Sequence, residues 1–149
     1  AEPELAAARL MQAWLDINAR QFAQAATRLD RLLGEDSWNL DALLARGLCY
    51  KWQQDHEGAC TCFKTACYAH ADSWLAQYFY GDCLRHDPQP GVARAPLQVA
   101  RRILSAAPDA ASGCQWLPLA PPPQDALFLI ERHLLALKQG LLPADETAD

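Results

Sequence analysis

Valine and isoleucine are scarce in this chain of 149 residues, and their scarcity argues against a fold rich in β-strands. Glycine is infrequent as well, with seven residues, whereas the abundant Ala, Leu, Arg and Gln residues favour helices. Hydrophobic residues make up 51% of the chain, so a buried core is possible and the composition argues against global disorder. Composition and length together predict one all-helical domain.

Neither a basic stripe nor a long apolar run is present. The net charge is −5 and both signs are interspersed, which argues against binding to nucleic-acid phosphates. The apolar stretch at residues 126–130 is far shorter than the roughly 20 residues that cross a bilayer. The N-terminal end is acidic and polar, unlike a signal peptide, and begins with Ala1 rather than Met. We therefore expect a cytoplasmic chain without membrane insertion, excised from a longer protein.

Signatures of catalysis are missing too. The sequence contains no Ser/His/Asp or Cys/His grouping, no glycine-rich phosphate loop and no metalloprotease motif. Its four histidines are scattered. We therefore expect no catalytic residue, no cofactor and no enzymatic activity in this chain.

The cysteines, by contrast, are numerous for a chain of this length, and no C-x-x-C pair occurs among them. We expect all six to lie inside amphipathic helices, namely Cys49, Cys60, Cys62, Cys67, Cys83 and Cys114. In a small secreted protein they would suggest disulfides. Inside helices that have a core of their own, free buried thiols in a reducing cytoplasm are the favoured interpretation.

Zinc binding is the alternative role for these cysteines. His56 and Cys60 are four positions apart, and Cys67 and His70 are three apart, so each pair can share a helix face. Cys60 and Cys62, however, point about 200° apart on an ideal helix. Because one ion could not easily join all of them, we predict structural thiols and no metal site.

A repeat with a period of 34 residues runs through most of the chain. When Leu40 is position 1, Gly47 and Ala59 occupy positions 8 and 20, and the same residue types recur one period later at Gly81 and Ala93. In the preceding unit, in which Ala6 is position 1, Ala25 occupies position 20. Small residues at these positions let two helices approach closely, while bulky residues at positions 11 and 24 fill the space beside them.

On this pattern, residues 6–107 resemble the tetratricopeptide repeat (TPR) family. The resemblance implies an all-α fold with three TPR helix-turn-helix repeats in a right-handed superhelix plus a C-terminal capping helix. We place the repeats at about 6–39, 40–73 and 74–107, a linker at 108–123 and the capping helix at 124–139, all in a single domain, 1–142. Residues 143–149 are expected to be a disordered tail.

Prolines and caps refine the predicted helix boundaries. A proline-rich loop at 87–91, together with Pro96, indicates that the last helix of the third repeat begins late, near Ala95. Asp125 is expected to be the N-cap of the capping helix and Gly140 its stop.

The resemblance also implies a partner-binding groove on the first helix of each repeat. Its expected lining residues are Leu10, Trp14, Leu48, Lys51, Trp52, Tyr78, Asp82, Arg85 and His86. The first two repeats offer apolar anchors and the third a polar, partly cationic end, which suits a peptide or helix with an apolar face and an acidic flank. Alternatively, the chain's own N- or C-terminal segment covers Trp14 and Trp52.

Residues 71–85, ADSWLAQYFYGDCLR, suggest a particular kind of TPR protein. They are similar to the last TPR repeat of CheR-type chemoreceptor methyltransferases, whose pattern is D-x-x-L-A-H-Y-x-L-G-x-x-L-R. This resemblance implies a regulatory domain that binds a chemoreceptor, a signalling protein or its own catalytic domain. A small cytoplasmic TPR chaperone for a secreted or assembled protein is the alternative, and an enzyme that uses the thiols is a third, weaker one.

Overall fold

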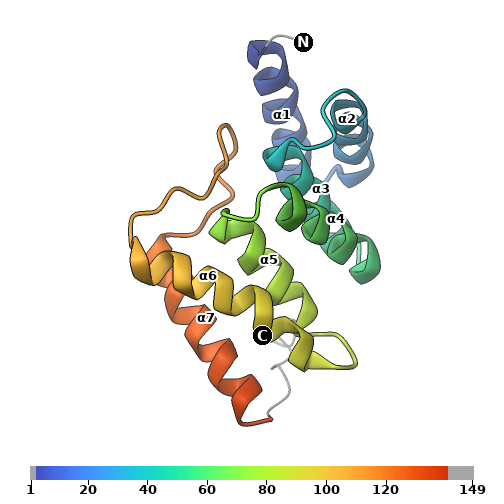
Figure 1. Cartoon of the computed structure of the whole chain (residues 1–149). Helices are drawn as coiled ribbons and strands as arrows, with labels where there is room; N and C mark the ends of the chain where they lie inside the picture. The colour runs from blue at the N-terminus through green and yellow to red at the C-terminus, as the bar shows by residue number, and fades with distance from the viewer. Residues whose placement is uncertain (1–2, 141–149) are drawn as a thin grey trace.

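The computed structural model describes residues 3–140, and within this range it contains helices and no strands (Figure 1). The seven α-helices and one short 3-10 helix are α1 (Pro3–Asn18), α2 (Phe22–Glu35), α3 (Leu40–Trp52), α4 (His56–Ala69), α5 (Trp74–Leu84), η1 (Pro90–Ala93), α6 (Arg94–Ala106) and α7 (Pro123–Lys138). Residues 1–2 and 141–149 lie outside the described range, and so does the tail predicted at 143–149.

The helices form three consecutive pairs, α1 with α2, α3 with α4 and α5 with α6. Each pair packs on the next through α2 against α3 and α4 against α5, and α7 closes the stack by packing on α6 (Figure 1). This arrangement confirms the predicted fold class of stacked helix pairs with a final capping helix. No helix in the described part of the chain is long and apolar enough to cross a membrane.

The turns inside the first two pairs share one backbone conformation. Arg20 and Gln54, which occupy the same position of successive repeats, both have a positive φ, of 60° and 66°. The N–H of the next residue then donates to a carbonyl of the preceding helix, from Gln21 to Asp16 at 2.7 Å and from Asp55 to Tyr50 at 2.8 Å. A left-handed residue therefore ends the first helix of each of these repeats.

The third pair cannot use this turn because Pro88 occupies the corresponding position. The proline ring restricts φ to negative values and leaves no N–H, so Pro88 can neither adopt the left-handed conformation nor donate. The chain instead ends α5 at Leu84, earlier in the repeat than α3 ends, and inserts η1 before α6. As expected, α6 begins late, at Arg94, and Pro96 lies in its first turn.

Close helix packing depends on glycines at position 8 of the repeat. A Cβ added to Gly47 would overlap the ring of Phe63, and a Cβ added to Gly81 would lie 2.6 Å from Cγ of Leu97. Phe63 and Leu97 both occupy position 24, and both are buried in the core. The two glycines therefore let the helices of a pair approach to a distance that no larger residue allows.

The capping helix α7 begins differently from the prediction. Its N-cap is Pro122, Pro123 is the first helical residue, and no side chain caps its N-terminus. The N-cap role predicted for Asp125 is therefore wrong, although an acidic residue in the first turn still interacts favourably with the helix dipole. At the other end, Gly140 has φ of 71°, which fits its predicted role as the stop.

Alanine at position 47 should destabilise the protein. We expect Gly47→Ala to lower the free energy of unfolding by about 1–3 kcal/mol, because the methyl group must displace the Phe63 ring. Gly34→Ala in α2 is the matched control. Nothing lies within 4 Å of its added Cβ, so it should stabilise by about 0.5–1 kcal/mol through helix propensity. Urea unfolding measures both, and equal effects of the same sign would contradict the packing role.

Candidate functional site

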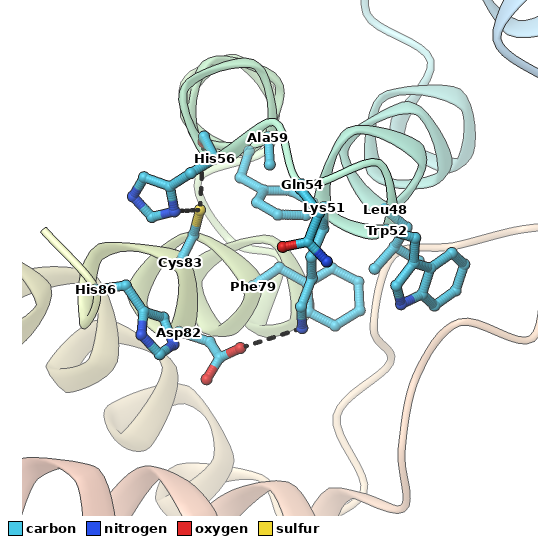
Figure 2. Close-up of a pocket in the computed structure, with 11 residues that line it drawn as sticks. Leu48, Lys51, Trp52, Gln54, His56, Ala59, Phe79, Asp82, Cys83 and His86 are labelled. Carbon is cyan, nitrogen blue, oxygen red and sulfur yellow. Dashed lines mark hydrogen bonds and ion pairs between the residues drawn. The ribbon is translucent and has the colours of Figure 1, made fainter. Parts of the chain in front are cut away.

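A pocket of about 340 Å³ opens between α3, α4 and α5 near the C-terminal ends of α3 and α5 (Figure 2). Its size is in the range of pockets that hold a ligand or a few side chains of a partner. The lining residues are Leu48, Lys51, Trp52, Gln54, His56, Ala59, Phe63, Phe79, Asp82, Cys83 and His86.

The floor of the pocket is apolar and its rim carries an exposed tryptophan. Phe63 and Phe79 pack together with ring centroids 5.5 Å apart, and Leu48 lies beside them. Trp52 is 42% exposed and is supported by Phe22, with ring centroids 6.0 Å apart. An aromatic side chain that is held in place yet exposed at the edge of an apolar floor is well suited to anchor a partner.

Asp82 carries most of the charge interactions on the opposite wall. Its carboxylate lies 2.8 Å from Nη2 of Arg85, 3.6 Å from Nζ of Lys51 and 3.8 Å from Nε2 of His133. Figure 2 shows Lys51 reaching from α3 across the pocket to this carboxylate. Because Arg85 is buried and paired with Asp82, this part of the cationic end expected from the sequence lies inside the protein.

Five of the nine residues predicted to line the groove meet at this pocket: Leu48, Lys51, Trp52, Asp82 and His86. The other four lie elsewhere. Leu10 is fully buried in the core and Trp14 is half-buried against it. Tyr78 packs beside Phe79, and Arg85 bonds to Asp82 beneath the surface. Repeat position alone therefore does not tell which of the nine predicted residues reach the surface.

Several lining residues were missed by the sequence analysis. Phe63, Ala59 and His56 belong to the second helix of the repeat, and Cys83 occupies position 10, whereas the expected groove used only selected positions of the first helix. The small-and-large pattern of the repeat had already assigned Phe63 and Ala59 to helix packing. No local signal marks a core residue that also forms the bottom of a pocket.

The segment between α6 and α7, residues 107–122, covers the other end of the same surface (Figure 1). The Asp41 carboxylate, at the N-terminal end of α3, accepts hydrogen bonds from three successive backbone N–H groups of this covering segment. They belong to Gln115 at 3.0 Å, Trp116 at 2.9 Å and Leu117 at 2.8 Å. Asp41 is 3% exposed, so this carboxylate is almost completely enclosed by the segment.

Two further hydrogen bonds hold the covering segment at the N-terminal end of α5. The Ser73 hydroxyl donates to the carbonyl of Ser112 at 2.5 Å, and the Trp74 indole N–H donates to the carbonyl of Ala110 at 3.0 Å. The chain therefore occupies the N-terminal half of this surface and leaves the pocket at the C-terminal half open. Trp52 remains exposed, so the described residues do not cover it.

All six cysteines are free thiols. Five lie on helices as expected, whereas Cys114 lies in the covering segment. Burial raises the pKa of Cys49 and Cys62 to about 11 and the pKa of Cys67 and Cys114 to about 12. These four side chains stay protonated at neutral pH, and a protonated thiol is a poor nucleophile. Burial thus gives these thiols the properties of structural residues.

Comparison with known proteins agrees with this geometry. The tetratricopeptide repeat family model matches residues 41–73. Two solved structures of the Yersinia enterocolitica type III secretion translocator chaperone SycD share the fold. One, described as an alternative dimer, has a TM-score of 0.77 and 12% identity over 93% of this chain and 96% of that chain. The other has a TM-score of 0.75 and 12% identity over 94% and 88%. No curated protein sequence gives a significant match.

The family model and the structural comparison together describe the kind of fold that this chain has. The chain contains a tetratricopeptide repeat at residues 41–73, and this repeat lies within a stack of helix pairs whose fold the two SycD structures share. The resemblance to methyltransferase regulators gains no support, since the structural neighbours named above are secretion chaperones.

Removing the Asp41 carboxylate should free the covering segment. We expect Asp41→Ala to lower the free energy of unfolding by about 1.5–3 kcal/mol, because three backbone donors lose a charged acceptor. Hydrogen exchange at residues 115–117 should become faster. Asp72→Ala removes an exposed carboxylate from the turn before α5 and serves as the control. Unchanged exchange in the Asp41 variant would show that other contacts hold the segment.

Proposed function

We propose that this chain is a TPR chaperone that shields an apolar segment of a partner protein, one destined for secretion or assembly, in the cytoplasm. The fold it shares with a translocator chaperone over nearly the whole length supports this proposal. The observation that carries it is the open apolar pocket between α3, α4 and α5, with Trp52 exposed at its rim.

The pocket chemistry indicates which segment would bind. Its floor of Leu48, Phe63 and Phe79 accepts an apolar anchor, and Trp52 can close over that anchor. Burial of such side chains contributes about 1.5–3 kcal/mol each, enough for one or two anchors to dominate the affinity. Asp82 is shared by Arg85 and Lys51, so a positive charge remains on this wall at the half-exposed Lys51, and an acidic group beside the apolar anchor would fit there.

An extended partner conformation is supported by the covering segment. Residues 110–117 show how backbone of no regular structure lies along this surface, with its N–H and C=O groups satisfied by Asp41, Ser73 and Trp74. A partner segment in the pocket would lie next to it on the same three-helix surface. Two extended segments, one internal and one from the partner, would then cover the length of α3 and α5.

A methyltransferase regulator is the second candidate, and the similarity of residues 71–85 is its support. Packing accounts for much of that similarity. Leu75 and Ala76 of the shared pattern are fully buried, and Gly81 makes room for Leu97. Because any repeat stacked in this manner needs such residues, the stretch favours the TPR fold without favouring receptor methylation.

Site-specific cross-linking in the source cells separates the two candidates. A photoreactive phenylalanine analogue at Trp52 should capture one partner, and mass spectrometry should identify it as a secreted or translocated protein. The same analogue at Tyr68, which is 82% exposed on α4 and outside the pocket, is the control. Capture of a chemoreceptor or a methyltransferase from position 52 would favour the regulator instead.

Trp52→Ala should then weaken binding of the captured segment by about 30-fold or more, as expected for an anchor worth about 2 kcal/mol. Its melting temperature should change little, because the side chain is already 42% exposed. Fluorescence anisotropy with a labelled segment measures the affinity. Tyr68→Ala should bind like the wild type, and equal losses in both variants would refute the pocket as the binding site.

A further inference from the structure

One imidazole and two thiols meet where the first turn of α4 approaches the C-terminal end of α5. Cys60 Sγ lies 3.6 Å from Nε2 of His56, and Cys83 Sγ lies 3.7 Å from Nδ1 of the same ring. The two sulfur atoms are 2.6 Å apart. One ligand atom from each residue can be chosen so that all three lie within 4.8 Å of one another. Among the residues that the structure describes, no other group of this kind comes together.

These distances fit tetrahedral coordination after a small adjustment. Zn–S bonds of about 2.3 Å and Zn–N bonds of about 2.0–2.1 Å imply N···S edges of about 3.6 Å and S···S edges of about 3.8 Å. Each observed N···S distance has the length of such an edge, but the two distances involve different nitrogens of the His56 ring. The ring would therefore have to turn so that one nitrogen faces both sulfurs, and the sulfurs would have to separate by about 1 Å. Cys60 is only half-buried and His56 is exposed, so both side chains have room to move.

We propose that His56, Cys60 and Cys83 bind a zinc ion, with His86 as the fourth ligand. His86 follows Cys83 by three positions, just beyond the end of α5, and is exposed. Its ring lies 6.4 Å from the His56 ring, at 89° to it, and both rings flank Cys83 in Figure 2. The set is then His-x3-Cys on α4 and a Cys-x2-His pair that begins on α5 and ends just beyond it, a Cys2His2 combination typical of structural zinc sites.

The surroundings of the two sulfurs favour a cation. The Asp82 carboxylate lies near Cys83 and the Asp87 carboxylate near Cys60, and their negative charge attracts a cation. Lys51, which pairs with Asp82, offsets part of this charge. When the ion binds, each thiol releases its proton to solvent, so two thiolates balance the two charges of Zn²⁺ and the imidazoles stay neutral.

A disulfide is the competing explanation for the short sulfur–sulfur distance. A disulfide bond measures about 2.05 Å, however, and the structure has both cysteines as free thiols. Forming that bond would also require an external oxidant to accept two electrons and two protons. Zinc needs no change of oxidation state, and it also uses His56 and His86, for which a disulfide provides no role.

Bound zinc would fix one wall of the pocket. His56, Cys83 and His86 all line it, and together they connect α4 to α5 across the boundary between the second and third helix pairs. The metal site rests on these ligands alone and does not depend on the proposed partner. If a partner segment does bind in the pocket, the ion would set the spacing of the two helices that hold it.

Metal titration of the full chain tests the proposal. The protein is stripped with a chelator under a phosphine reductant, then titrated with ZnCl2 by calorimetry and with Co²⁺ by absorption spectroscopy. We expect one ion per chain, a release of about two protons, and the visible bands of tetrahedral, thiolate-bound Co²⁺. Zinc should also raise the melting temperature.

Variants connect binding to the named residues. His56→Gln, Cys60→Ser and Cys83→Ser should each weaken zinc binding by more than the roughly 10–100-fold loss typical of an outer partner. Their melting temperatures should no longer respond to zinc. His86→Gln should weaken binding as well. Cys62→Ser is the matched control, because Cys62 lies close to Cys60 on the same helix but outside the cluster.

Three outcomes would overturn the site: no stoichiometric binding, wild-type affinity in the Cys60→Ser variant, or an equal loss in Cys62→Ser. A Cys60–Cys83 disulfide in protein purified without reductant, together with no zinc uptake after reduction, would assign the pair to redox chemistry instead. His56→Gln keeps the test decisive if Cys83→Ser fails to fold, because His56 is exposed and its loss leaves the core intact.

Discussion

The contact between a glycine at position 8 and a bulky residue at position 24 is the constraint on which the rest of the structure depends. Gly47 faces Phe63 and Gly81 faces Leu97, so α3 lies close on α4 and α5 close on α6. Since the same contact recurs in the next repeat, the second and third pairs adopt similar geometries and stack in register. The pocket lies at the junction of these two pairs, and its walls therefore inherit their positions from the two contacts.

Most of the fold could be predicted from the sequence because the repeat is a short-range pattern. Recurring small residues indicated the helix pairs, and Pro88 with Pro96 indicated the late start of α6 at Arg94. The capping helix shows where such reasoning stops. Aspartate is a residue type that N-cap positions favour, and this led to the prediction for Asp125. Pro122 has an extended backbone, however, and Pro123 is the first helical residue, so α7 begins earlier than predicted. The backbone conformation of the two prolines therefore decides where α7 begins, and the capping preference of Asp125 does not.

The site was less predictable because its contacts are distant in the sequence. Periodicity placed Leu10 on the same helix face as Leu48, but it could not reveal that Leu10 is completely covered. Asp41 meets residues that are 74 to 76 positions away, and Cys60 meets Cys83 at a separation of 23. Spacing along one helix relates Cys60 to His56 and Cys62, whereas its contact with Cys83 comes from the next helix pair and has no signal in that spacing.

The way in which Asp41 holds the covering segment has a consequence for how this protein can evolve. Its carboxylate recognises main-chain N–H groups, and the side chains of Gln115 and Trp116 take no part in those hydrogen bonds. Mutations can therefore accumulate at these two positions without loosening the segment, whereas an exchange of Asp41 for a neutral residue removes the acceptor for all three donors. Homologues should therefore retain an acidic residue at position 41, while the residues that correspond to Gln115 and Trp116 vary.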